Sequence, residues 1–222
     1  MSARGLFVTG TDTGVGKTHA SCVLLAALRA RGLRAVGMKP VASGCRETPQ
    51  GLRNDDADAL IGASAPTPSY ADCNPYAFAP PIAPHIAARA SGREIRLEPV
   101  LAAHSRLAPI ADRIVIEGVG GWMAPLSDSL MQADLVRALD VPVILVVGLR
   151  LGCINHALLS ARAITADGAR LAGWIANRID PDMQEVDANL ATLRARIGAP
   201  LLGVLDHVAD RSPGGALETA AL

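Results

Sequence analysis

Apolar residues gather along the chain in short runs that alternate with longer amphipathic segments. The later runs are almost continuously hydrophobic, which is typical of strands buried on both faces of a sheet. Strands are predicted at residues 5–8, 34–38, 113–117, 142–147, 171–175 and 201–204. Helices are predicted at residues 17–31, about 55–61, 98–107, 131–139, 154–167 and 182–197.

This alternation predicts an α/β fold of three layers, in which a mostly parallel sheet carries helices on both faces. Two segments interrupt this alternation of predicted strands and helices. Residues 40–53 are polar with little helical or strand signal, and residues 66–84 are rich in proline. Long loops in compact domains are usually functional or mobile. No linker or repeat divides the chain, so residues 1–222 are expected to form one domain.

The composition narrows the class of protein. Half of the residues are hydrophobic and 19% are charged, so the chain can bury a sizeable core. Basic and acidic residues balance at 21 each, which predicts no general attraction to nucleic acid or to a membrane. The apolar stretch 141–149 is too short to span a bilayer, and residues 1–8 are too short for a signal peptide. Four cysteines without a CxxC pair are expected to be reduced thiols, so we expect a cytoplasmic protein.

Lysine is rare in this chain. Only Lys17 and Lys39 occur among the 21 basic residues, and the others are arginines. A compact ammonium cannot always be replaced by a guanidinium fork, so lysine retained at two positions suggests a specific task. Chance or codon bias is the alternative. Both lysines, however, fall in loops that other patterns mark.

Residues 5–18 have the pattern of a phosphate-binding loop. A hydrophobic strand enters a Gly/Thr turn, and a helix begins at Lys17. Glycines let backbone N–H groups converge on an anion, and the helix N-terminus adds partial positive charge. Lys17 would reach the β- and γ-phosphates, and the Thr18 hydroxyl would bind Mg²⁺. The strict pattern GxxxxGK[ST] fails by one residue, because position 11 is Thr11 and Gly10 precedes it.

Polar residues follow two other predicted strands, at the edge where open α/β sheets bind ligands. Lys39 and Ser43 follow the second strand, where Lys39 could bind a phosphate or a substrate carboxylate or carbamate. Glu117 is expected at the end of the third strand, before the glycine run 118–121, and resembles the Walker B acid that holds Mg²⁺. An ordinary strand end is the alternative for Glu117.

Three further segments contain candidate binding residues, and two of them also have a purely structural interpretation. The cluster 54–58 could supply a Mg²⁺ ligand, or Asn54 could simply cap a helix whose first turn is acidic. The turn 151–156 opens a helix whose free N–H groups could bind a carboxylate, whereas Cys153 has no evident base and is not expected to be a nucleophile. Asn177 could contact a nucleotide base or be a turn residue.

The chain resembles the dethiobiotin synthetase family, within the P-loop NTPase superfamily, from residue 8 to about residue 204. The segments that carry the resemblance are FVTGTDTGVGKT (7–18), KPVASG (39–44), GLRNDD (51–56), NPYAFAPPIAPH (74–85), IEGVGGW (116–122), PLSD (125–128), PVILVVG (142–148), LGCINH (151–156) and AGWIAN (172–177). The resemblance implies that 7,8-diaminopelargonic acid reacts with CO₂ to give a carbamate, that ATP phosphorylates the carbamate, and that ring closure yields dethiobiotin, ADP and phosphate.

The resemblance also implies roles for individual residues. Lys17 and Lys39 would be catalytic and would bracket the carbamate and the γ-phosphate, while Thr18, Asp56 and Glu117 would ligate Mg²⁺. The ATP site would comprise Thr13, Gly14, Val15, Gly16, Lys17, Thr18, Asp56, Glu117, Gly118, Val119, Gly120, Asn177, Arg178, Asp206, His207 and Val208. Thr13 and Ser43 would contact the diamine or its carbamate. Gly152, Cys153 and Asn155 would hold the tail carboxylate across a homodimer interface.

Two other functions are possible for a P-loop protein of this size. An amidoligase of the cobyrinic-acid type usually carries a second, glutamine-hydrolysing domain, for which 222 residues leave no room. A partitioning or regulatory ATPase tends to carry a signature lysine early in the loop, where this chain has Thr11, and lacks the segments 39–44 and 151–156. The residues leave the nucleobase open between adenine and others such as cytosine.

Overall fold

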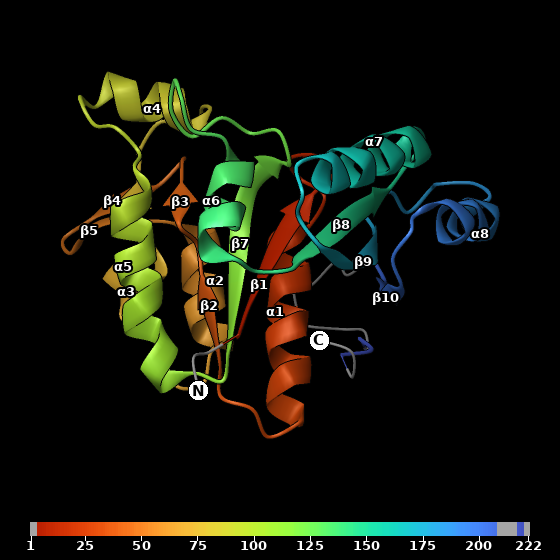
Figure 1. The fold of residues 1–222 in the computed structure, drawn as a ribbon, viewed down its shortest axis with the longest axis horizontal. Coiled ribbons are helices and arrows are strands. Elements are labelled where there is room, and N and C mark those ends of the chain that lie inside the picture. Colours follow the sequence, from red (N-terminus) through yellow and green to blue (C-terminus); the bar gives the residue numbers. More distant parts are fainter. Residues whose placement is uncertain (1–3, 208–216, 220–222) are drawn as a thin grey trace.

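A six-stranded parallel sheet forms the centre of the computed structural model, which describes residues 4–207 and 217–219 (Figure 1). Its strands are β1 (Arg4–Gly10), β2 (Ala35–Met38), β7 (Arg113–Gly121), β8 (Val143–Leu149), β9 (Leu171–Arg178) and β10 (Leu201–Leu205). They lie in the order β10-β9-β8-β1-β7-β2, and every neighbouring pair is parallel. Each strand overlaps one of the six predicted, so the predicted sheet is confirmed.

Helices cover both faces of this sheet. One face carries α1 (Lys17–Ala30) and α2 (Asp55–Ala63), and the other carries α5 (Leu97–Leu107), α6 (Gln132–Leu139), α7 (Cys153–Ala166) and α8 (Val186–Arg196). Successive strand residues point to opposite faces. Leu6 and Val8 therefore belong to the core with α1, whereas Phe7 belongs to the core on the other face. The three-layer prediction is confirmed.

The residues 40–53, expected as an irregular loop, contain three short strands: β3 (Val41–Ala42), β4 (Arg46–Thr48) and β5 (Gly51–Arg53). Strands β4 and β5 form an antiparallel hairpin. Arg46 and Arg53 both pair with Asp58 of α2, so the hairpin is attached by charges. The expectation of a loop was wrong because no apolar alternation marks an element that is stabilised in this way.

Short elements also occupy the proline-rich segment 66–84. They are α3 (Tyr70–Cys73) and β6 (Tyr76–Ala77), which pairs with β3. Helix α4 (Pro84–Ala90) and a 3₁₀ turn (Ala108–Ile110) were not predicted either, and α8 begins at Val186 rather than at residue 182. Elements of one or two turns are too short to show a period. In Figure 1, α4 lies at the upper left, on the side toward which the arrowheads of β1 and β7 point.

None of the helices in the described part of the chain combines the length and the apolar character needed to cross a membrane.

Candidate functional site

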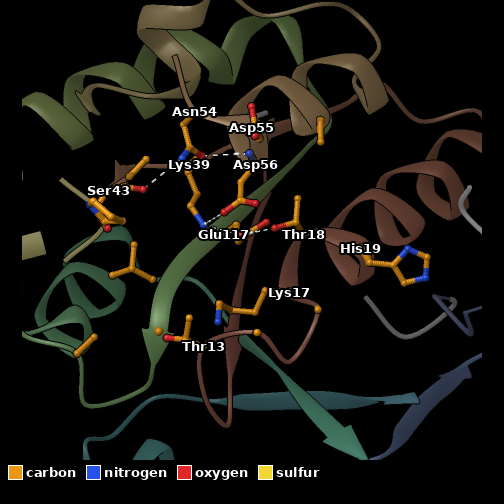
Figure 2. A pocket seen from close by; sticks show the side chains of 18 of the residues that line it. Thr13, Lys17, Thr18, His19, Lys39, Ser43, Asn54, Asp55, Asp56 and Glu117 are labelled. Atoms are coloured by element: carbon orange, nitrogen blue, oxygen red, sulfur yellow. Dashed lines mark hydrogen bonds and ion pairs between the residues drawn. The ribbon is translucent and has the colours of Figure 1, made fainter. Parts of the chain in front are cut away.

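One cavity of about 1060 Å³ opens at the carboxyl edge of the sheet. Strand β1 leads into the predicted phosphate-binding loop, residues 10–18, which we call the glycine loop. Strand β2 leads into Lys39, and β7 carries Glu117. Asp56 enters the same cavity from the first turn of α2. Figure 2 shows Lys39, Asp56, Thr18 and Glu117 directed toward one another. Parallel strands end at a common edge, and this brings together residues that are far apart in the sequence.

The glycine loop has a backbone that only glycine adopts readily. Gly14 and Gly16 have φ values of +76° and +84°, in the left-handed region that favours glycine. A Cβ on Gly16 would lie 2.0 Å from the Nδ2 of Asn177. That same Nδ2 donates a hydrogen bond of 3.0 Å to the carbonyl of Val15. The loop therefore packs closely against the Asn177 side chain of β9. Its conformation depends on this contact with a distant residue, which a local sequence motif does not contain.

The loop also holds its own cation and an uncapped helix start. The Nζ of Lys17 donates to the carbonyl of Asp12 at 2.8 Å. The N-cap residue of α1 is Gly16, which has no side chain to cap the helix, so the first N–H groups of α1 can receive an anion. These are the features that a triphosphate requires.

Beside the loop lies a buried cluster of opposite charges. The Nζ of Lys39 lies 2.6 Å from Oε1 of Glu117 and 3.0 Å from Oδ2 of Asp56, and it donates to the carbonyl of Gly118 at 3.3 Å. The Thr18 hydroxyl donates to the same Oε1 of Glu117 at 3.0 Å. Glu117 is completely buried, and Lys39 is 4% exposed. A charged carboxylate at such a position needs compensation, which Lys39 supplies.

Glu117 does not end its strand as the sequence suggested. Strand β7 continues to Gly121, and Glu117 pairs in register with Val8 of β1. The glycine-rich residues 118–121 therefore extend the strand rather than form a turn. The pairing with β1 shifts register after Val8 and Glu117 and resumes at Gly10 and Gly121, so the strand continues through the glycine segment with an irregular ladder.

The charges in the cluster shift one another's proton affinities. Burial, together with the neighbouring Lys39 ammonium, lowers the pKa of Lys17 to about 8. Burial alone would lower the pKa of Lys39, but the carboxylates of Glu117 and Asp56 outweigh burial and raise it. Burial likewise opposes ionisation of Asp56, yet the Lys39 ammonium holds the pKa of this carboxyl below its ordinary value. At neutral pH Lys17 and Lys39 are therefore positively charged and Asp56 is negatively charged.

The oxygen atoms of the cluster fit a magnesium ion. The Oε2 of Glu117 is buried and has no hydrogen-bond partner among the described residues, although buried carboxylate oxygens normally have one. Oxygens of Thr18 and Asp56 lie in the same cluster. Within residues 4–207 and 217–219, no three His, Cys, Asp or Glu side chains form a metal site by themselves. Mg²⁺ commonly takes one or two carboxylates and completes its shell with water and phosphate oxygens.

The cavity also reaches β9 and the residues after β10. Asn177, Arg178, Asp206 and His207 line it, and Nε of Arg178 lies 3.7 Å from Oδ1 of Asp206. Asn177 lies within β9, paired with Gly148 and Leu205, so the turn alternative for this residue was wrong. Its strand is longer than predicted because β8 and β10 both continue alongside it. Val208 lies outside the described residues.

Most of the predicted site residues line this cavity: Thr13, Gly14, Gly16, Lys17, Thr18, Lys39, Ser43, Asp56, Glu117, Val119, Gly120, Asn177, Arg178, Asp206 and His207. Val15 and Gly118 do not line it, but their carbonyls bind Asn177 and Lys39. Gly152, Cys153 and Asn155 lie away from it, at the start of α7, where the Cys153 side chain is buried. Asn54 lines the cavity and also caps α2, as one of its two readings stated.

Sequence reasoning missed a buried glutamine that holds β7 in place. Gln132 is 1% exposed, accepts a hydrogen bond from the Val119 N–H at 2.8 Å, and donates to the carbonyl of Gly121 at 3.0 Å and to the Thr9 hydroxyl at 3.3 Å. It is the first residue of α6. A polar residue at a helix start is ordinary, so no signal in the sequence marked it.

Comparisons with known proteins show which family this chain belongs to. Residues 4–213 match a family model described as an AAA domain. The ATP-dependent dethiobiotin synthetase BioD of Xanthomonas euvesicatoria pv. vesicatoria (strain 85-10) is 59% identical over 203 residues, which cover 91% of each chain. The BioD protein of Xylella fastidiosa (strain 9a5c) is 58% identical over 208 residues, which cover 94% of this chain and 92% of the relative.

Solved structures support the fold alone. The signal recognition particle receptor FtsY of Elizabethkingia anophelis superposes with a TM-score of 0.52 at 17% identity, covering 90% of this chain and 58% of the receptor. The cell division protein ftsY of Thermotoga maritima gives a TM-score of 0.51 at 15% identity, covering 91% of this chain and 61% of that chain.

Proposed function

This chain belongs to the ATP-dependent dethiobiotin synthetase family, ligases of biotin biosynthesis, and we propose that its cavity carries out the family's ring closure with the residues described above. The observation that carries the proposal is the convergence of Lys17, Lys39, Asp56 and Glu117 beside a glycine loop. Family membership disfavours both the partitioning ATPase and the amidoligase alternatives.

The reaction joins one carbon to a diamine at the expense of ATP. An amine of 7,8-diaminopelargonic acid adds to CO₂, and an oxygen of the resulting carbamate attacks the γ-phosphorus while ADP leaves. The second amine then attacks the carbamate carbon, and phosphate leaves as the ureido ring closes. Such chemistry depends on aligned reactants and on neutralised oxygen charge more than on a covalent nucleophile.

The two lysines supply the neutralising charge in this proposal. Lys17 lies in the glycine loop and would contact the β- and γ-phosphates. Lys39 has its Nζ in contact with Glu117 and Asp56, and it would bind the carbamate oxygens and the transferred phosphoryl group. Both ammonium groups are buried, and charge interactions are stronger where water is excluded.

Thr18, Asp56 and Glu117 would hold Mg²⁺, and the unpartnered Oε2 of Glu117 supports this role. When bound with ATP, Mg²⁺ neutralises and orients the phosphate oxygens. Glu117 would be fixed for this purpose by the Thr18 hydroxyl, which contacts its other oxygen. Asp56 would be fixed by its position in the first turn of α2.

We further propose a homodimer in which the turn 152–155 binds the substrate's tail carboxylate in the partner's site. The turn lies outside the cavity of its own chain, and Leu151 beside it is 95% exposed. Leu159, on the same helix α7, is 57% exposed. These two exposed leucines support the proposed contact surface. Thr13 and Ser43 would contact the diamine, and the chain would act in the cytoplasm as one domain.

The test is to incubate the protein with Mg-ATP, ¹³C-bicarbonate and 7,8-diaminopelargonic acid. We expect dethiobiotin one mass unit heavier than the product from unlabelled bicarbonate, with one ADP released per ring. Omitting the diamine should abolish the coupled ADP release. Absence of dethiobiotin, together with an ATPase rate that does not respond to the diamine, would contradict the proposal.

A further inference from the structure

The backbone of Lys39 is held on both sides by the segment around α3. The Lys39 N–H donates to the carbonyl of Cys73 at 2.7 Å, and the Nδ2 of Asn74 donates to the carbonyl of Lys39 at 2.7 Å. Asn74 is 4% exposed. Neither Cys73 nor Asn74 lines the cavity. These two residues therefore affect the site through the backbone of Lys39 rather than by lining the cavity.

A tyrosine hydroxyl connects this segment to α2. The Tyr70 hydroxyl accepts a hydrogen bond from the Asn54 N–H at 2.8 Å and donates to Oδ1 of Asn74 at 3.0 Å. A phenol can do both at once, because it has one hydrogen and free lone pairs. The Arg53 guanidinium lies 3.9 Å from the centre of the Tyr70 ring and helps to hold it.

Asn54 carries the connection to Asp56. Its Oδ1 accepts hydrogen bonds from the Asp56 N–H at 3.1 Å and from the Ala57 N–H at 3.2 Å. The path from Lys39 through Asn74, Tyr70 and Asn54 thus ends on the backbone of Asp56. The side chains of Lys39 and Asp56 then meet at 3.0 Å. The contacts form a closed ring that includes two residues of the proposed catalytic cluster.

We propose that Tyr70 is a positioning residue that sets the placement of Lys39 relative to Asp56, a role that rests on the proposed function of those two residues. The Tyr70 hydroxyl joins the Asn54 N–H on the α2 side to the Asn74 side chain on the α3 side. The Cys73 thiol adds a separate contact between α3 and α2, at 3.8 Å from the Ala57 carbonyl, that does not involve Asn54 or Asp56. Tyr70→Phe removes both hydrogen bonds of the hydroxyl and leaves the aromatic ring of residue 70 in place. Small displacements matter here, since a misplacement of about 1 Å in an active site can cost about 10²-fold in rate.

The chain provides a matched control in its other tyrosine. Tyr70 and Tyr76 are the two tyrosines, and the Tyr76 hydroxyl also accepts a backbone hydrogen bond, from the Arg96 N–H at 3.1 Å.

We expect Tyr70→Phe to lower kcat about 10- to 100-fold and to raise the Mg²⁺ concentration needed for half-maximal rate, as for other residues that orient metal ligands. Tyr76→Phe should stay within about two-fold of the wild type, because the hydrogen bond that it loses joins the Arg96 N–H and not a residue of the cluster. Equal losses in both variants, or no loss in Tyr70→Phe, would overturn the proposal.

A second measurement reports on Lys39 without catalysis. Protein labelled with ¹³C,¹⁵N-lysine has only two labelled side chains, Lys17 and Lys39, and a Lys39→Met sample assigns their NMR signals. The Lys39 signal should move in Tyr70→Phe and stay unchanged in Tyr76→Phe. An unmoved Lys39 signal in Tyr70→Phe would refute the positioning role. If the wild type formed no dethiobiotin, the proposed function would fail, and the NMR spectra would still decide the role of Tyr70.

Discussion

The Nζ of Lys39 lies 2.6 Å from Oε1 of Glu117, and the two side chains are 5% and 0% exposed. Removing one partner of such a buried pair leaves an uncompensated charge in a medium that solvates it poorly. The pair therefore affects folding as well as catalysis, and experiments on either residue have to separate the two effects.

Lys39→Ala is expected to lower turnover by about 10²- to 10³-fold, the range found when one group that stabilises transition-state charge is removed. Binding of Mg-ATP should persist, because the glycine loop, Lys17 and the start of α1 are unchanged. Steady-state kinetics and calorimetric titration with a non-hydrolysable ATP analogue would measure the two quantities. Lys39→Arg is the control for charge, and we expect it to be inactive too, because a guanidinium does not fit where an ammonium contacts two carboxylates. Near-normal turnover in Lys39→Ala would contradict the role given to Lys39.

Lys39→Met should lower the free energy of unfolding by about 3–5 kcal/mol, the usual cost of leaving one buried charge without its partner. The double variant Lys39→Met/Glu117→Gln should recover a large part of that loss, because it removes both charges. Urea unfolding in the absence of metal and nucleotide would provide the comparison. The single variant Glu117→Gln completes the comparison. If the double variant lost as much free energy of unfolding as Lys39→Met and Glu117→Gln together, the two residues would not be coupled in this way.

Gly16→Ala should be more damaging than Gly14→Ala. Both glycines have positive φ, so both substitutions carry a backbone cost of about 1–2 kcal/mol. At Gly16 the added Cβ would also collide with the Nδ2 of Asn177, at 2.0 Å, whereas no atom of the described residues lies within 4 Å of a Cβ on Gly14. Thermal unfolding and ATP affinity of the two variants would reveal the difference, and equal effects would show that the Asn177 contact adjusts freely.

Raising the pH should weaken nucleotide binding and stabilise the fold, and both effects are expected to arise from deprotonation of Lys17. The pKa of Lys17 is lowered from 10.5 to about 8 by burial and by Lys39, so the free protein loses this charge as the pH rises through 8. In the unfolded chain Lys17 keeps its proton up to its ordinary pKa. The unfolded state therefore binds more protons between pH 8 and 10.5, and Lys17 makes folding more favourable as the pH rises across that window.

The measurement is ATP affinity and urea unfolding between pH 7 and 9.5, in the wild type and in Lys17→Met. The wild type should show both trends, and the difference between the two proteins isolates Lys17. Identical pH dependence in both would mean that another group titrates.

Much of this protein followed from its sequence. The apolar runs predicted the six sheet strands because most positions of these strands are buried between the two helix layers. The glycine pattern predicted the loop at Gly14 and Gly16, since positive φ restricts the choice of residue. The scarcity of lysine singled out Lys17 and Lys39, and the structure places both in one cavity.

Tertiary structure alone decided how those residues are arranged. The contact of Lys39 with Asp56 and Glu117, the contact of Asn177 with the loop, and the Tyr70 connection all join residues far apart in the chain. The short elements between residues 41 and 77 are held by ion pairs, caps and side-chain hydrogen bonds. Local periodicity reports which face of an element is buried, but it contains no information about which distant polar group meets another. For that reason the sequence determined the sheet, the loop and the candidate residues, and folding determined the distances that let them act together.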